Sequence, residues 1–143
     1  MKYSLLEGFE RYDMLLAAVA IGENKLIFVL DSGSTHNLIA NSAYKKLESL
    51  FTPVGKKMDV CGIEGNHATC DMVTADINLG ECYSRTLFAI ADIDNVVKDI
   101  MKEYNIQIHG LLGIPFLRAN NCTIDFGAMS IDIAGPKQMK EAV

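Results

Sequence analysis

The sequence predicts an all-β domain that carries two or three short helices, and three observations lead to this fold class. Apolar residues occur in strand-length runs, and one long segment alternates apolar and polar residues with the period of two typical of a half-buried strand. Glycine-containing turns separate the runs. The chain has 143 residues, half of them apolar, which is enough for one hydrophobic core. We therefore expect a single domain over residues 1–143, with its core at about residues 14–133.

The first two strands are expected to form a hairpin. Met14–Ile21 and Lys25–Leu30 are apolar segments on either side of the turn-forming stretch Gly22–Asn24. The second arm is apolar on both faces, which is typical of a strand in the centre of a sheet or barrel. It ends abruptly at the loop Asp31–Thr35. Because the carboxylate of Asp31 directly follows a run of buried residues, we do not expect Asp31 to be an ordinary surface charge.

A helix and a long hairpin are expected next. Asn41 is a suitable cap for a helix that runs to about Phe51, and the stretch Thr52–Gly55 is expected to end it. The segments Met58–Ile63 and Ala68–Leu79 then bracket a glycine-rich tip. Along the second segment apolar and polar residues alternate, which predicts a strand with one solvated face.

The second half of the chain repeats this order of strand, glycine loop and helix. Thr86–Ala91 is expected to be a buried strand. Asp92 or Asp94 is a suitable cap for a helix whose apolar stripe, from Ile93 to Tyr104, is expected to cover the barrel. Pro115 stands near the first turn of a further short helix, where its missing N–H does no harm.

The chain is expected to close with another hairpin. Its arms are Cys122–Phe126 and Met129–Ile133, and Gly127 lies in the turn between them.

Charge and composition exclude several classes of function. The chain has 13 Lys and Arg against 18 Asp and Glu, a net charge of −5, and no basic run. Nucleic acid and anionic membranes are therefore not expected partners. No secretory signal is visible, and the early apolar run Met14–Ile21 is far shorter than the roughly 20 residues of a membrane span. The sequence predicts a soluble, cytoplasmic protein.

The cysteines indicate neither a disulfide scaffold nor a metal site. Cys61, Cys70, Cys82 and Cys122 show no C-x-x-C spacing. His67 lies between the first two, but the ligand spacings typical of zinc are absent. We expect half-buried thiols on strands, with no metal and no cofactor.

Two motifs together resemble the retropepsin-like aspartic proteases. The apolar strand Leu26–Leu30 followed by Asp31–Thr35, with the sequence DSGST, resembles their active-site strand and loop. The segment Gly110–Leu117 is similar to their second motif, in which two apolar residues and a glycine precede a short helix. The glycine-tipped hairpin lies between the two motifs, where the family has its flap. The resemblance covers roughly Met14 to Ile133.

The resemblance implies a closed β-barrel of the retropepsin-like acid protease type, with an active site at a two-fold dimer interface. It also implies roles for individual residues. Asp31 is the expected catalytic residue, and the Ser32 hydroxyl is expected to hydrogen-bond across the dimer. Gly33 allows a tight turn, and the Ser34 hydroxyl is expected to hydrogen-bond the carboxylate. His36 and His109 flank the motifs and are expected to be structural or solvated.

The candidate site residues fall into three groups. The active-site loop supplies Asp31, Ser32, Gly33, Ser34 and Thr35; the flap supplies Gly62, Ile63, Glu64 and Gly65; the second motif supplies Leu111, Leu112 and Gly113.

The chemistry of this family requires two carboxylates, and the chain offers one motif. Two carboxylates about 3 Å apart share one proton, so the pair can both activate water and protonate the leaving group. No Asp other than Asp31 precedes Ser/Thr-Gly. An aspartic endopeptidase made of this chain must therefore be a homodimer, with Asp31 of both copies on the two-fold axis and a peptide or protein as substrate.

Two alternatives remain open at this stage. A module of the same fold that is catalytically silent would bind a peptide or dimerise without cutting. A processed fragment of a larger polyprotein would carry the same motifs, although the Met1 start favours a stand-alone cellular or bacterial-type member.

Overall fold

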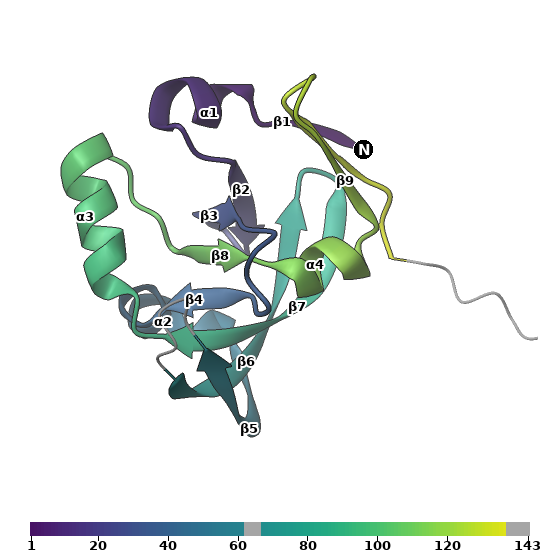
Figure 1. Cartoon of the computed structure of the whole chain (residues 1–143). Helices are drawn as coiled ribbons and strands as arrows, with labels where there is room; N and C mark the ends of the chain where they lie inside the picture. Colours follow the sequence, from purple (N-terminus) through teal and green to yellow (C-terminus); the bar gives the residue numbers. More distant parts are fainter. Residues whose placement is uncertain (62–66, 137–143) are drawn as a thin grey trace, which may run out of the picture.

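The computed structural model describes residues 1–61 and 67–136, and Figure 1 shows how its elements are arranged. The prediction of a mostly β chain is confirmed, but the described part has four α-helices and one 3-10 helix instead of the two or three short helices expected. The strands are β1 (Lys2–Ser4), β2 (Leu16–Ile21), β3 (Asn24–Leu30), β4 (Leu38–Ala40), β5 (Thr52–Cys61), β6 (His67–Leu79), β7 (Cys82–Ala91), β8 (Gly110–Leu112), β9 (Cys122–Asp125) and β10 (Ser130–Ile133). The helices are α1 (Leu6–Tyr12), α2 (Asn41–Leu47), the 3-10 helix η1 (Glu48–Leu50), α3 (Asp94–Tyr104) and α4 (Ile114–Ala119).

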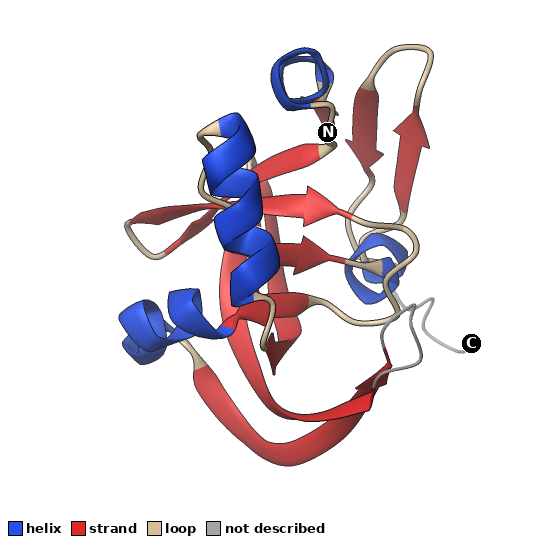
Figure 2. Cartoon of the chain, turned by 60° about the vertical axis from the view of Figure 1, so that its left-hand side comes forward, coloured by secondary structure: helices blue, strands red, loops and turns tan. Residues whose placement is uncertain are grey.

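Two sheets organise the strands. The larger has the order β2-β3-β8-β4-β7-β6-β5, in which β3–β8 and β4–β7 are the parallel pairs. It curls so strongly that β2 also pairs with β6, at Ala20 and Asn78, and Figure 2 shows the bend of its long strands. The smaller sheet has the order β1-β10-β9 and joins the first strand to the closing hairpin. Segments from both ends of the described chain therefore lie side by side.

Aromatic side chains form the centre of the core. Phe28 and Phe88 have ring centroids 5.5 Å apart, and Phe51 meets Phe88 edge-on at 6.0 Å. All three are buried, and such packing adds to the stabilisation from burial alone. Phe28 belongs to β3, so the core anchors the strand that directly precedes Asp31.

The alternation predicted for β6 is confirmed, with one exception. Its inner face carries the buried side chains Val73, Ala75, Ile77 and Leu79. Met72 alternates with these residues and so belongs to the other face, but it is also buried, because a second apolar cluster that contains Leu38 and Ala89 covers it. This end of β6 is therefore covered on both sides.

The start of α2 differs from the expected one. The side chain of Asn41 forms no cap; instead the Ser42 N–H donates to Asp94 Oδ1 at 3.1 Å. A tertiary contact therefore replaces the local cap. The helical segment ends before Thr52, as expected: α2 is followed by η1, and β5 begins at Thr52. Gly55, whose φ is +76°, lies at an irregularity in the pairing of β5 with β6.

The helix α3 covers less of the sheet than its apolar stripe predicts. Val97 is buried, whereas Val96 is 58 % exposed and Met101 is also exposed. No side chain caps its start, so the caps proposed at Asp92 or Asp94 are wrong. The short α1 was not expected, because its seven residues bury no side chain and include Gly8. No helix of the described chain is long and apolar enough to cross a membrane.

Candidate active site

Asp31 lies on a tight turn directly after β3. The Asp31 N–H donates to Leu112 O at 2.9 Å, which ties the turn to the second motif. The Asp31 backbone carbonyl accepts the Ser34 N–H at 3.1 Å, and carboxylate Oδ1 accepts the Gly33 N–H at 2.9 Å. In the described part of the chain Oδ2 accepts no hydrogen bond. The partly exposed carboxylate is thus oriented through one oxygen, with the other open to water or to a partner.

Ser34 does not contact the carboxylate, contrary to expectation. Its Oγ donates to His36 O at 2.7 Å, and its carbonyl accepts the Ile114 N–H at 2.9 Å. Thr35 Oγ1 lies 3.1 Å from His36 Nδ1. Ser34 therefore stabilises the loop against α4, because the turn directs its hydroxyl back along the chain and away from Asp31.

The two glycines of the second motif allow close packing beneath the loop. Gly110 lies between β3 and β4, where a Cβ would collide with Leu38 O and the Phe28 ring. A Cβ on Gly113 would lie 2.5 Å from Ser34 O and 2.6 Å from His36 O. Any side chain at either position would push these segments apart. The family resemblance implies that this motif supports the active-site loop, and the close packing of its glycines gives a physical reason for that role.

Asn37 is a structural residue of the site that the sequence analysis missed. It is 3 % exposed; its Oδ1 accepts the Gly113 N–H at 2.8 Å and its Nδ2 donates to Leu87 O at 3.1 Å. Its backbone carbonyl accepts the Ala89 N–H at 2.8 Å. Asn37 therefore joins the loop, the second motif and β7. In the sequence, the feature that could have indicated this role is that Asn37 is a polar residue directly before the apolar strand β4.

A cleft of about 490 Å³ opens beside the loop. Asp31, Gly33, Ser34, Thr35 and His36 line one side. The other walls are mostly apolar and come from β4 to β8 and the start of α3: Leu38, Val60, Cys61, Ala68, Cys70, Ala91, Asp92, Ile93 and Leu111. Such a groove suits a chain segment with apolar side chains.

The charges in the cleft are few. Asp31 and Asp92 are the carboxylates among the described residues that line it. Burial raises the pKa of the Cys70 thiol, and the nearby carboxylates of Asp71 and Asp59 raise it further. Cys70 is therefore a protonated, weakly nucleophilic thiol at neutral pH. The described residues contain no group of three side chains suited to a metal ion.

The predicted site residues thus divide into three sets. Asp31, Gly33, Ser34, Thr35 and Leu111 line the cleft. Leu112 and Gly113 are buried beneath the loop, and Ser32 is exposed beside Asp31. Gly62, Ile63, Glu64 and Gly65 lie outside the described residues, although the strands that lead to them border the cleft.

Solved structures show what this fold is similar to. The retroviral protease-like domain of Ddi1 from Leishmania major matches with a TM-score of 0.57 and 14 % identity, over 91 % of this chain and 97 % of that one. EIAV protease, in a complex with the inhibitor HBY-793, matches with a TM-score of 0.53 and 18 % identity, over 73 % of this chain and 86 % of that one. The chain therefore has a retroviral protease-like fold. No family model matches the chain. No curated protein matches its sequence either.

Proposed function

We propose that this chain is an aspartic endopeptidase of the retropepsin type that works as a homodimer. The observation that carries the proposal is the Asp31 turn: a carboxylate oriented through one oxygen, at the edge of an apolar cleft, in a retroviral protease-like fold. Peptide or protein segments are the proposed substrates. No cofactor enters the mechanism.

The second carboxylate comes from the second copy in this mechanism. One chain supplies one Asp-Ser-Gly motif, so Asp31 and its symmetry mate meet on the two-fold axis and share one proton. The ionised carboxylate takes a proton from a water molecule, which attacks the peptide carbonyl, and the protonated one supports the carbonyl oxygen. The proton then passes to the leaving amine. In this mechanism the hydroxyl of Ser32, which is exposed next to Asp31, hydrogen-bonds across the axis.

The remaining parts of the chain position this pair. In this proposal Leu111, Leu112 and Gly113 support the loop, and the strands β5 and β6, which border the cleft, contact the substrate. The flap residues expected from the sequence, Gly62, Ile63, Glu64 and Gly65, lie outside the described residues. We infer one domain in which the curled larger sheet is a closed barrel; the pairing of β2 with β6 supports this.

The substitution Asp31→Asn tests the proposal. It keeps the size of the side chain and the hydrogen bond from Gly33, but removes the titrating oxygen. We expect cleavage of a peptide library, read by mass spectrometry, to fall by about 10²- to 10⁴-fold. Circular dichroism and sedimentation should stay unchanged.

Asp92→Asn is the matched control, because Asp92 lines the same cleft away from the turn. It should keep most of the cleavage. Adding excess Asp31→Asn chain to the parent should also suppress activity, since mixed dimers carry one competent carboxylate. An Asp31→Asn variant that cleaves as fast as the parent would refute the proposal, and a chain that binds peptides as a strict monomer would be a binding module.

A further inference from the structure

A second cavity lies at the other end of β3 from Asp31. It has a volume of about 220 Å³ and lies between the start of β3, helix α2 and the segment that leads into β8. Its polar lining includes Lys25, Ser42, Lys46, Gln107 and His109. Lys25 and Asp31 stand six residues apart on one extended strand, roughly 20 Å. The cavity is therefore separate from the cleft.

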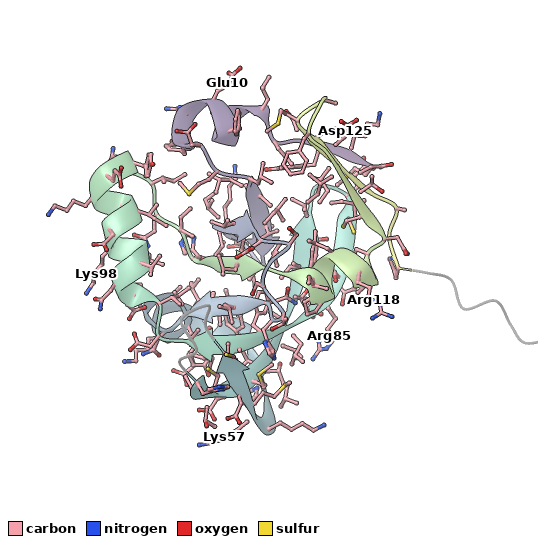
Figure 3. The ribbon with its side chains drawn as sticks, viewed as in Figure 1. Glu10, Lys57, Arg85, Lys98, Arg118 and Asp125 are labelled. Atoms are coloured by element: carbon pink, nitrogen blue, oxygen red, sulfur yellow. The ribbon has the colours of Figure 1, made fainter. Side chains whose placement is uncertain are left out.

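Two lysines line this cavity, and one carboxylate stands at its edge, because Asp94 Oδ1 accepts the N–H of the lining residue Ser42 at 3.1 Å. Lys25 and Lys46 are both among its described lining residues, which include no carboxylate. Neither lysine forms an ion pair within the described chain, whereas Lys57 and Arg85 are paired with nearby aspartates. Figure 3 labels these two paired residues, Lys57 and Arg85, at the surface of the molecule. Both lysine side chains of the cavity, Lys25 and Lys46, are exposed, and Lys25 also borders two neighbouring hollows. Two lysines at the border of one concave site raise the positive potential there, although the whole chain carries −5.

His109 adds a neutral hydrogen-bond donor. Its Nδ1 accepts the Ile27 N–H at 2.9 Å, so the neutral ring carries its proton on Nε2. Burial lowers the pKa of His109, and the nearby Lys46 ammonium lowers it further. The ring is therefore neutral at neutral pH, with Nε2–H as a fixed donor. No described residue accepts a hydrogen bond from it.

The other polar groups are also able to donate. The Gln107 amide donates to Ile108 O at 3.1 Å through Nε2, which retains a second hydrogen. The Ser42 hydroxyl completes the set. Two lysines, a histidine, a glutamine and a serine from three segments of the chain thus line the cavity. This set suits an anion that accepts several hydrogen bonds at once.

We propose that this cavity binds a phosphate group, either as free phosphate or as part of a small organic phosphate. Lysine is a common phosphate ligand, and a phosphate group presents three or four acceptor oxygens to donors from different directions. The cavity is smaller than the 300 to 1,000 Å³ or so of a pocket for a drug-sized molecule, so a small anion fits it.

The test is a calorimetric titration of the full chain with phosphate at constant ionic strength and neutral pH. We expect saturable binding with one site per chain. Lys25→Gln and Lys46→Gln should each weaken binding about tenfold, as expected for loss of a charged hydrogen bond. Lys98→Gln is the matched control, because Lys98 is exposed on α3 outside the cavity; it should change binding less than about twofold.

A second measurement locates the ligand. Among the three histidines, only the ring signals of His109 should move in NMR spectra recorded during the titration, while those of His36 and His67 stay in place. Two further ligands are compared with inorganic phosphate. Tighter binding of glycerol 3-phosphate than of inorganic phosphate indicates that the natural ligand is an organic phosphate. Malonate is an anion without a phosphate group, so it tests whether the site selects phosphate. The proposal is overturned if phosphate shows no saturable binding or if malonate binds more tightly than either phosphate. It is also overturned if Lys98→Gln weakens phosphate binding as much as the cavity variants do, or if the His109 signals do not move.

Discussion

Single polar groups hold the candidate active site together at the residue scale. The Asn37 side chain uses both its oxygen and its nitrogen, to Gly113 and Leu87, in a position that water does not reach. A buried amide that satisfies two backbone groups specifies one arrangement of the segments it joins, because any other arrangement leaves those groups unpaired. Asn37 therefore positions the loop without touching the cleft.

Asn37→Ala is expected to destabilise the fold by about 1–3 kcal/mol, because it leaves the buried Gly113 N–H without an acceptor. The free energy of unfolding in urea measures this effect. Asn78→Ala is the control, since Asn78 is exposed on β6, and it should change stability by less than about 0.5 kcal/mol. Equal effects of the two substitutions would show that the Asn37 bonds contribute nothing measurable.

His109 connects three strands at the scale of elements. Its N–H donates to Ile27 O, its Nδ1 accepts the Ile27 N–H, and its carbonyl accepts the Ala40 N–H. The segment before β8 is thus held between β3 and β4 by a side chain that acts as a backbone acceptor. Protonation of Nδ1 would place two donors face to face and break the bond to Ile27.

This arrangement predicts that stability falls as the pH is lowered. The pKa of His109 is lower in the folded chain than in the unfolded chain, where it is about 6.5. The unfolded state therefore binds more protons once the pH falls below about 6.5, so stability is full above that pH and declines until the folded pKa is passed. His109→Asn offers an acceptor that does not titrate, and should flatten the decline measured by thermal unfolding at about pH 7.5 to 5.5.

His67→Asn is the control for this experiment, because His67 is exposed on β6. It should keep the slope of the parent chain. If His109→Asn loses stability with falling pH as steeply as the parent, another group is responsible. The result also bears on the proposed protease, since His109 would limit how acidic a medium the folded site tolerates.

The whole molecule is joined by the packing of its two sheets. Leu5, between β1 and α1, is 1 % exposed and belongs to the main core together with Ile131 and Ile77. Its N–H donates to Met129 O at 2.8 Å, and the Tyr3 hydroxyl accepts the Ala18 N–H at 3.0 Å. The small sheet therefore shares its core with the large one.

Leu5→Ala is expected to cost about 2–5 kcal/mol, because it leaves a cavity in that shared core. Hydrogen exchange of the Ile131 and Ile77 amides reports on the two sheets separately. We expect both opening free energies to fall equally, whereas Leu6→Ala, at a 45 % exposed position, should change neither by more than about 0.5 kcal/mol. Loss of protection confined to Ile131 would show that the sheets unfold independently and would argue against one domain.

Local patterns predicted much of this fold. The β2–β3 hairpin follows from two apolar runs around Gly22, whose φ is +60°, and the inner face of β6 follows from its alternation. Pro115 at the start of α4 follows from its missing N–H. The Asp31 turn is visible because it interrupts an apolar strand. Each of these features depends on residues within a few positions of one another.

Other features depend on what packs opposite, which the local sequence does not contain. Asp94 was expected to cap its own helix, yet its carboxylate accepts a hydrogen bond from α2. Ser34 was expected at the carboxylate, yet it bonds to His36. The apolar residues of α3 predicted that one face of the helix would be buried, but they did not predict that Val96 would remain exposed.

By itself, then, the sequence determined the strand pattern, the place of the Asp31 turn and the existence of a second glycine motif. Only the tertiary structure decided that Asn37 joins these two motifs across 76 positions and that His109 joins Ile27 across 82. It also brought Lys25, Lys46 and His109 to one cavity. The physical reason is that turns and strand periodicity are set by neighbouring residues. A buried hydrogen bond or a shared cavity exists only once distant segments have packed.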